Sequence, residues 1–171
     1  MNAIARQVLS DLEVQIQQKQ AQVIVNPLPT LDADPTQMHQ LFQNLISNAL
    51  KFNQPQVPPQ IEIQAEVLAL PLPETVQSSE VSGLCEIAIV DNGIGFEEKY
   101  LDRIFTIFQR LHGRSEFEGT GIGLAICRKI VERHSGSITA ISHLGRGSTF
   151  MIRLPLKQPF LNSIELDPDV Q

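Results

Sequence analysis

Hydrophobic residues recur along this chain with the periods of both helices and strands. In residues 2–22 the apolar side chains Ile4, Val8, Leu12 and Ile16 stand four positions apart among polar residues, which is typical of an amphipathic helix. Two interpretations of this helix are open on periodicity alone. It packs on the domain that follows it, or it is the end of a longer helix that belongs to a preceding domain.

A second helix is predicted with clear start and stop signals. Asp34 is a suitable N-cap, Pro35 occupies the first helical position, and Gln37 stands three residues after the cap. The helix is expected to run to about Phe52, before the prolines of residues 55–59. Its apolar positions repeat at intervals of four and three residues, which marks the face turned to the core. These positions are Met38, Phe42, Leu45, Ala49 and Phe52.

Shorter apolar runs predict the strands and two more helices. Helical spacing recurs in residues 97–111 and 122–134. Helices and strands do not alternate strictly, and hairpins dominate the strand connections. This order favours an α+β fold, a two-layer α/β sandwich in which helices cover one face of a largely antiparallel sheet. The expected strands are residues 23–25, 61–67, 86–90, 137–143 and 148–154.

Composition is that of an ordinary globular domain. The chain has 171 residues, enough for one domain with a buried core, and 42% of them are apolar. Its net charge of -6 gives no reason to expect nucleic acid as a partner. Cys85 and Cys127 are too few for a disulfide framework and are expected to be buried. No apolar run reaches the ~18 residues of a membrane span, so we expect a cytoplasmic location without membrane contact.

Candidate chemistry begins on the polar face of the second helix. Asn44 and Asn48 stand one turn apart, and Gln40 and Lys51 share their face. A carboxamide oxygen is a neutral ligand suited to Mg²⁺, and a lysine contacts phosphate groups as a cation. Taken alone, this face is more typical of the solvated side of an ordinary amphipathic helix.

The strand at 86–90 leads into residues 91–96, which read DNGIGF. A carboxylate such as Asp91 at the end of a buried strand accepts a hydrogen bond from an exocyclic amino group, as in adenine. Gly93 and Gly95 permit a close backbone approach or a positive φ. The alternative is a plain hairpin turn, for which Asn-Gly is a strong signal. The apolar residues that follow lead into a helix rather than a returning strand, which favours the pocket.

A second glycine cluster opens the helix of residues 122–134. Amides at a helix N-terminus form a site for anionic groups such as phosphates. The cluster is neither a Rossmann fingerprint nor a P-loop, and a flexible hinge is the alternative. Its residues are Gly119, Thr120, Gly121, Ile122, Gly123 and Leu124.

The residues between the two glycine clusters are predicted to form a lid over a bound nucleotide. Phe105 and Phe108 would anchor it, and Arg110 or Arg114 would reach the γ-phosphate. An ordinary surface helix with a loop is the alternative. The order of the four features together indicates a pocket for a purine nucleotide, its phosphates and a divalent cation.

With these motifs in place, the chain resembles the catalytic and ATP-binding domain of sensor histidine kinases, in the GHKL superfamily, over about residues 22–155. The stretch 104–138 is similar to phytochrome-like bacterial kinases. Five family motifs are matched in order. The N box, G1 box, F box, G2 box and last glycine motif correspond to residues 40–52, 91–96, 105–108, 119–124 and 145–150.

The resemblance implies the Bergerat ATP-binding fold, a mixed sheet under three helices, with ATP and Mg²⁺ as ligands. Asp91 would bind the adenine amino group, and Phe52 would flank the base. Asn48, with Asn44 near it, would hold Mg²⁺, while Lys51 and the G2 backbone would contact the phosphates or ribose. The catalytic residues that it implies are Asn44, Lys51, Arg110 and Arg114. The remaining nucleotide-binding residues that it implies are Gly93, Gly95, Gly119, Thr120, Gly121, Ile122, Gly123, Leu124 and Thr149.

Asn44 separates two branches of the superfamily. Its hydrolytic members carry a glutamate there that activates water, whereas asparagine is not a base at neutral pH. The resemblance therefore implies phosphoryl transfer to a histidine of a separate helical domain, which in turn serves a response regulator. The alternatives are a non-catalytic nucleotide-binding regulatory module and a serine kinase of the anti-sigma type, which usually lacks the lid motif. The acceptor motif surrounds none of His39, His112, His134 and His143.

The resemblance also divides the chain. Residues 1–22 are expected to be the end of a helix from a preceding dimerisation and phosphoacceptor domain. Residues 23–156 are expected to form the ATP-binding domain, and residues 157–171 a C-terminal tail. Residues 71–83 are predicted to be an exposed loop that is longer than the family usually has.

Overall fold

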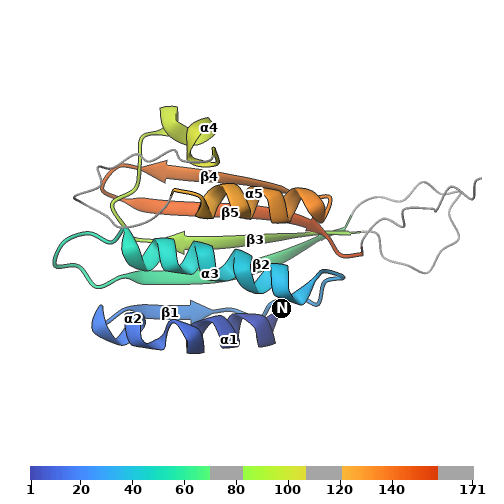
Figure 1. Ribbon diagram of the computed structural model, residues 1–171, viewed down its shortest axis with the longest axis horizontal. Coiled ribbons are helices and arrows are strands. Elements are labelled where there is room, and N and C mark those ends of the chain that lie inside the picture. Colours follow the sequence, from blue (N-terminus) through green and yellow to red (C-terminus); the bar gives the residue numbers. More distant parts are fainter. Residues whose placement is uncertain (70–82, 107–120, 158–171) are drawn as a thin grey trace, which may run out of the picture.

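The computed structural model of this protein describes residues 1–69, 83–106 and 121–157 (Figure 1). Within these residues, no helix is long and apolar enough to cross a membrane. The elements in chain order are α1 (Asn2–Asp11), α2 (Glu13–Gln18), β1 (Gln22–Val25), α3 (Pro35–Lys51), β2 (Gln60–Ala69), β3 (Gly83–Asp91), the 3-10 helix η1 (Glu98–Tyr100), α4 (Leu101–Ile104), α5 (Gly123–Arg133), β4 (Ser137–His143) and β5 (Gly147–Pro155).

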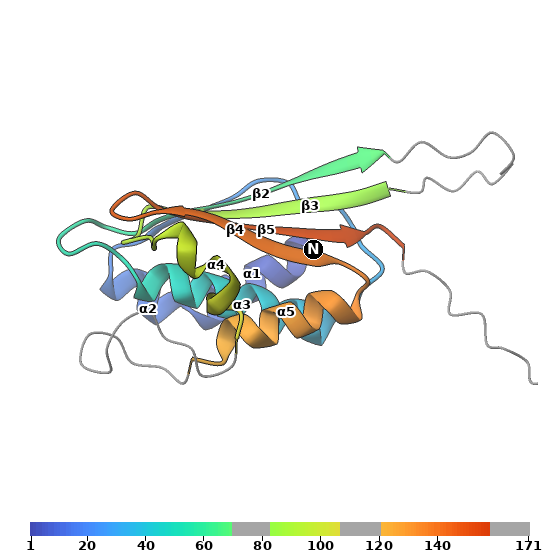
Figure 2. The ribbon, with the colours of Figure 1, turned by 90° about the horizontal axis from the view of Figure 1, so that it is seen from above.

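The strands form one sheet in the order β1-β2-β3-β5-β4. β1 runs parallel to β2, whereas the β2–β3, β3–β5 and β4–β5 pairs are antiparallel. Figure 2 shows two layers, with α1, α3 and α5 on one face of the sheet. This arrangement confirms the predicted α+β sandwich with a mixed, mostly antiparallel sheet.

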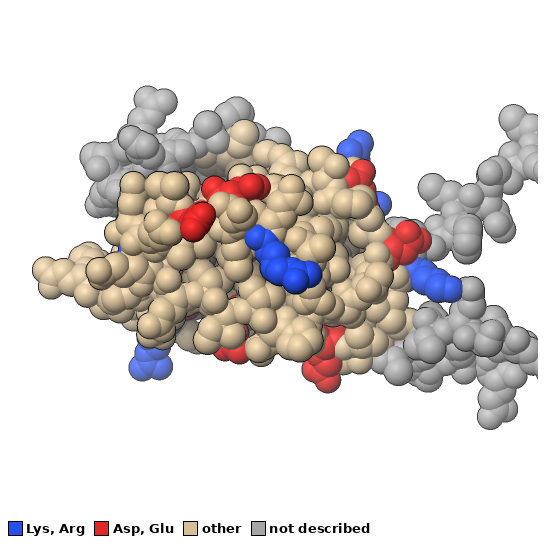
Figure 3. Space-filling model, turned by 90° about the horizontal axis from the view of Figure 1, so that it is seen from below, with Lys and Arg blue, Asp and Glu red and all other residues tan. Residues whose placement is uncertain are grey.

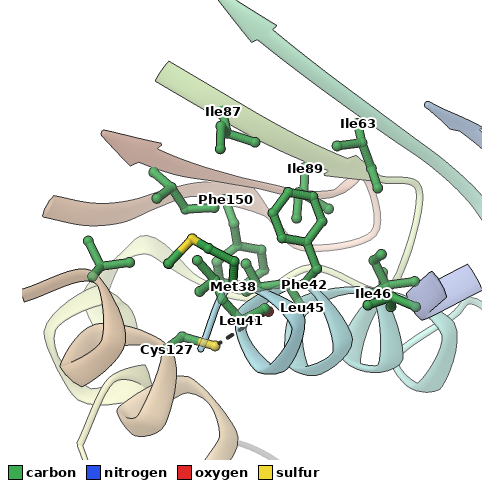
Figure 4. Close-up of a cluster of buried hydrophobic side chains, with 14 of the residues drawn as sticks. Met38, Leu41, Phe42, Leu45, Ile46, Ile63, Ile87, Ile89, Cys127 and Phe150 are labelled. Atoms are coloured by element: carbon green, nitrogen blue, oxygen red, sulfur yellow. Dashed lines mark hydrogen bonds between the residues drawn. The ribbon is translucent and has the colours of Figure 1, made fainter. Parts of the chain in front are cut away.

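The core lies between α3 and the sheet (Figure 4). Each large apolar side chain that is fully buried there contributes about 1.5–3 kcal/mol to stability. Cys85 and Cys127 are also buried, as predicted, and burial raises the pKa of their thiols to about 11 and about 12. The α3 side chains in this layer are Met38, Leu41, Phe42, Leu45 and Ile46, and those labelled on the sheet are Ile63, Ile87, Ile89 and Phe150.

The first helix is part of this core. Ala5, Val8 and Leu12 are buried against the domain. Asn2 exchanges hydrogen bonds with the backbone of Leu28, donating to its carbonyl oxygen at 2.7 Å and accepting from its N–H at 3.0 Å. On the edge formed by α1, α2 and β1, Figure 3 shows charged side chains lying apart among uncharged ones. The first helix therefore packs on the core of the domain that follows it.

The N-terminal end of α3 is closed by the cap that the sequence predicts. Asp34 Oδ1 accepts from the backbone N–H groups of Thr36 at 2.8 Å and Gln37 at 3.0 Å. The N–H of Asp34 in turn donates to Nε2 of the buried His134, at 3.1 Å. The other ring nitrogen of His134 contacts the carbonyl oxygen of Ile130 at 2.8 Å, so this histidine fastens α5 to the start of α3.

The helix expected at residues 97–111 differs from the structure. Residues 98–100 form a 3-10 turn, and α4 ends at Ile104. The helix stops there because Phe105 leaves helical geometry and is buried against Phe150, with ring centroids 6.5 Å apart. Residues from 107 onward in this prediction, nearly all of the predicted loop and most of the tail lie outside the described residues.

Candidate functional site

Two hydrogen bonds bring the sequence motifs to α3. Near the middle of the helix, Asn44 Nδ2 donates to the carbonyl oxygen of Gly123, at the start of α5, at 3.4 Å. Just beyond its C-terminal end, the carbonyl oxygen of Phe52 accepts from the N–H of Ile94 at 2.8 Å. These contacts are about 12 Å apart along the helix axis. Asn48 lies between them, so the two glycine clusters flank one helical face.

Asp91, the last residue of β3, is a largely buried carboxylate with one oxygen in use. Its Oδ1 accepts from the backbone N–H of Gly93 at 2.8 Å and of Ser148 at 3.3 Å. Within the described part of the chain, Oδ2 accepts no hydrogen bond, yet it is not sealed from solvent. Desolvation raises the pKa of this carboxyl to about 6, although the two backbone hydrogen bonds act to lower it. At neutral pH, Asp91 therefore offers an ionised oxygen to a ligand donor.

The backbone around Asp91 is packed so closely that three positions require glycine. A Cβ at Gly93 would lie 2.5 Å from the carbonyl oxygen of Phe52. Gly95 and Gly147 have φ angles of 62° and 92°, in the left-handed region, and a Cβ at either would collide with backbone oxygens. These approaches join the loop after α3, the loop after β3 and the β4–β5 hairpin into one wall.

Gln54 supports the same wall and was not identified from the sequence. Its Nε2 donates to the carbonyl oxygens of Asn92 at 2.8 Å and Gly93 at 3.1 Å. A single glutamine in a proline-rich loop carries no local signal of this role, because both partners lie far along the chain.

The family resemblance implies Thr149 as a nucleotide-binding residue, and the register of β5 shows where this side chain lies. Ser148 pairs with Asp91, and Thr149 pairs with Val90. Neighbouring side chains in a strand point to opposite faces of the sheet, so Ser148 shares the face of Asp91 while Thr149 points to the other. The residue beside the carboxylate is therefore Ser148, which no local pattern in the sequence distinguishes from Thr149.

The amide oxygens on α3 are suited to a hard cation. Asn44 and Asn48 are half-buried, and Asn44 uses its N–H group on Gly123, which leaves its oxygen as an acceptor. The side chain of Asn48 makes no hydrogen bond to any described residue. No group of three or more His, Cys, Asp or Glu side chains that would hold a metal occurs in the described ranges. A cation at this face would therefore take amide oxygens and oxygens of its phosphate ligand, a donor set that Mg²⁺ accepts.

Lys51 and Phe52 stand together at the C-terminal end of α3. The Lys51 ammonium lies 4.6 Å from the centroid of the Phe52 ring, within cation–π distance. Both side chains are half-buried. Because the carbonyl of Phe52 contacts Ile94, this pair is at the Asp91 end of the helical face rather than at the Gly123 end.

The start of the predicted lid and the start of α5 are described, whereas the lid itself is not. Phe105 is 4% exposed, and the guanidinium of Arg128 lies 5.0 Å from its ring centroid, so the first lid residue is anchored to α5 as well as to β5. Gly121 has a φ of 72° just before α5, and residues 122–124 are half-buried. The predicted residues that lie outside the described part of the chain are Phe108, Arg110, Arg114, Gly119 and Thr120.

Comparison with known proteins gives relatives among cyanobacterial phytochromes and sensory kinases. The chain is 47% identical over 148 residues to cyanobacterial phytochrome A of Nostoc sp., covering 86% of this chain and 18% of that protein. It is 36% identical over 156 residues to the adaptive-response sensory kinase SasA of Synechococcus elongatus, covering 90% of this chain and 37% of that protein. The chain therefore spans only a fraction of the length of these curated relatives.

The fold and the family agree with these relatives. The catalytic domain of the histidine kinase ThkA, in a nucleotide-free form, superposes with a TM-score of 0.69 at 23% identity, covering 92% of this chain and 93% of that one. Residues 33–158 match the family described as Histidine kinase-, DNA gyrase B-, and HSP90-like ATPase, which implies that the domain binds ATP. The chain belongs to this ATPase family and, within it, to the ATP-binding catalytic domains of histidine kinases.

Proposed function

We propose that this chain binds ATP with Mg²⁺ and transfers the γ-phosphoryl group to a histidine on a separate phosphoacceptor domain. The observation that carries the proposal is the position of Asn44. Its amide is fixed against the start of α5 through Gly123, where phosphates would meet the helix N-terminus. Because an amide is not a base at neutral pH, this position does not activate water for hydrolysis.

The remaining residues supply binding and orientation. Asp91 accepts a hydrogen bond from the adenine amino group through Oδ2, and Phe52 flanks the base. The amides at the start of α5 and the Lys51 ammonium hold the phosphates or ribose. Mg²⁺, when bound, neutralises phosphate charge, and the oxygens of Asn48 and Asn44 suit it as ligands. Phosphoryl transfer depends mainly on such positioning and electrostatics.

The proposal extends to parts of the chain and to partners that the described residues do not reach. Arg110 or Arg114 of the lid contacts the γ-phosphate, and Gly119 and Thr120 complete the phosphate site. The phosphoacceptor histidine passes its phosphoryl group to the receiver domain of a response regulator, and the domain works in the cytoplasm. Neither nucleic acid nor membrane takes part. We assign α1 and α2 to the catalytic domain, because α1 is built into its core.

The test is phosphoryl transfer in trans. The chain is mixed with γ-labelled ATP, Mg²⁺ and the phosphoacceptor domain of its own full-length protein. We expect label on the acceptor that is labile in acid and stable in base, as for phosphohistidine, with little free phosphate. Asn48→Ala should weaken Mg²⁺-dependent nucleotide binding about tenfold, or about 1.4 kcal/mol. Gln40→Ala, one turn before Asn44 and exposed, is the matched control and should leave binding unchanged.

Two results would contradict the proposal. Tight ATP binding without any phosphohistidine would indicate the alternative, a non-catalytic nucleotide-binding module. Rapid release of free phosphate would indicate an ATPase with a water-activating base elsewhere. Calorimetry of ATP and ADP with and without Mg²⁺ separates the two cases, because a regulatory module that binds both nucleotides with equal affinity is not expected of a kinase.

A further inference from the structure

Ser142 is a buried hydroxyl near the end of β4 that the proposed function does not use. It is 6% exposed and faces the helical side of the sheet, where apolar residues prevail. Its Oγ accepts from the N–H of Phe96 at 2.8 Å and donates to the carbonyl oxygen of Gly147 at 3.0 Å. A third contact, at 2.9 Å, joins it to Oγ of Ser148. Burying a hydroxyl in an apolar layer is unfavourable unless such partners satisfy it. The three contacts satisfy Ser142, and they indicate that its hydroxyl has a function at this position.

Counting protons fixes the direction of the Ser142–Ser148 hydrogen bond. Ser142 has one hydroxyl proton, and Gly147 receives it. The 2.9 Å contact must then be donated by Ser148 into a lone pair of Ser142. In the reverse arrangement, the Gly147 carbonyl loses the hydrogen bond from Ser142. The first arrangement satisfies the Phe96 N–H, both serine hydroxyls and the Gly147 carbonyl, and a fully satisfied buried network is the stable one.

This direction matters because Ser148 stands opposite Asp91. The two residues are register partners on adjacent strands, and their side chains share one face. Opposed Cβ atoms in such a pair lie about 4.5–5.5 Å apart, which is within reach of a rotated serine hydroxyl. While Ser148 donates to Ser142, its proton is unavailable to the carboxylate, and Oδ2 of Asp91 stays free for a ligand.

We propose that Ser142 is a positioning residue that does not touch the nucleotide. It holds the hydroxyl of Ser148 away from Asp91, and so keeps the carboxylate available to the adenine amino group. The inference rests on the proposed function, in that ATP is the ligand of Asp91. Without Ser142, the hydroxyl of Ser148 turns to the carboxylate and competes with the amino group of the base.

The experiment compares nucleotide affinities by calorimetry at pH 7.5. Ser142→Ala should weaken ATP binding about tenfold, whereas Ser142→Thr, which keeps the hydroxyl, should restore most of it. Purine riboside triphosphate lacks the exocyclic amino group, so its affinity should change little, and the preference for ATP should collapse. Thr139→Ala removes an exposed hydroxyl from the same strand and is the matched control, with no change expected.

A double variant separates positioning from general damage to the fold. If Ser142 acts through Ser148, then adding Ser142→Ala to Ser148→Ala should cost no further ATP affinity. Additive losses, an equal loss of both nucleotides, or an unchanged Ser142→Ala would overturn the inference. Should Ser142→Ala fail to fold, Ser142→Cys, of similar size and weaker in hydrogen bonding, takes its place in every arm. Failure of the wild-type chain to bind ATP would instead refute the proposed function.

Discussion

The two ends of α3 are both organised by an aspartate, but they differ in what each aspartate leaves over. Asp34, at the N-terminal end, spends Oδ1 on two backbone N–H groups and contacts the Gln37 amide through Oδ2 at 3.4 Å. Asp91, near the C-terminal end, spends one oxygen on the backbone and leaves the other accessible. The difference teaches that an aspartate serving only the fold has both oxygens hydrogen-bonded within the protein. One that serves a ligand keeps one oxygen without an internal hydrogen bond.

The largest effect at the Asp91 end is expected from a substitution that disturbs the backbone packed against Asp91. In Gly147→Ala, the new Cβ would collide with the carbonyl oxygen of Asp91 at a residue with φ of 92°. Overpacking together with left-handed strain should lower the free energy of unfolding by about 4 kcal/mol, measured by urea denaturation. Gly145→Ala is the control, because its φ is 76° but a Cβ there meets nothing within 4 Å. It should lose only about 1 kcal/mol. Equal losses would show that conformation alone, rather than close approach, accounts for the glycine.

The buried carboxylate should also give stability an unusual pH dependence. Burial raises the folded-state pKa of Asp91 from 3.8 to about 6, so the folded protein binds this proton more tightly than the unfolded chain. The contribution is present in full below pH 3.8 and is lost as the pH rises through about 6. Its size is up to about 3 kcal/mol. The check is the difference between wild-type and Asp91→Asn unfolding from pH 4 to 7, in which other titrating groups cancel. A flat difference would contradict the burial.

The same substitution should separate binding from folding. Asp91→Asn removes a charge-assisted acceptor and should weaken ATP binding by about 1.5–3 kcal/mol, measured by calorimetry. At pH 7 its free energy of unfolding should not fall, because a desolvated charge is removed as well. An unchanged affinity would exclude Asp91 from the nucleotide site.

The opposite outcome is expected at the other end of the helix. Asp34→Ala removes an N-cap and should lower the free energy of unfolding by about 1 kcal/mol. ATP affinity, measured in the same buffer as for Asp91→Asn, should not change. A loss of affinity in Asp34→Ala would break the comparison, since it would mean that the two ends are coupled through the helix.

Local signals allowed much of the fold to be predicted. The cap, the proline and the apolar stripe of α3 are all short-range, and the helix begins at Pro35 as predicted and ends at Lys51. The helix expected at 97–111 is interrupted after Ile104, although the apolar period continues there, because Phe105 is drawn into a non-local contact with Phe150. Tertiary packing overrode the period there.

The site was predictable where a residue type identifies its own chemistry, and not where a role depends on register. Asp91 and the glycines after it stand out in the sequence. Ser148 and Thr149 are adjacent hydroxyl residues, and only the pairing of β5 with β3 shows which of them faces the carboxylate. Ser142 and Gln54 take their roles from partners in other segments, so no local pattern distinguishes them.

The buried thiol of Cys127 makes the α3–α5 contact observable in the unmodified protein. Its Sγ lies 4.0 Å from the carbonyl oxygen of Leu41, on the side of α5 that faces α3. With a pKa of about 12, the group stays protonated at physiological pH, and a thiol-alkylating reagent gains access only when the two helices separate. Because Cys85 is a second buried thiol, the alkylation rate assigned to Cys127 by peptide mapping reports how often α3 and α5 separate near the start of α5.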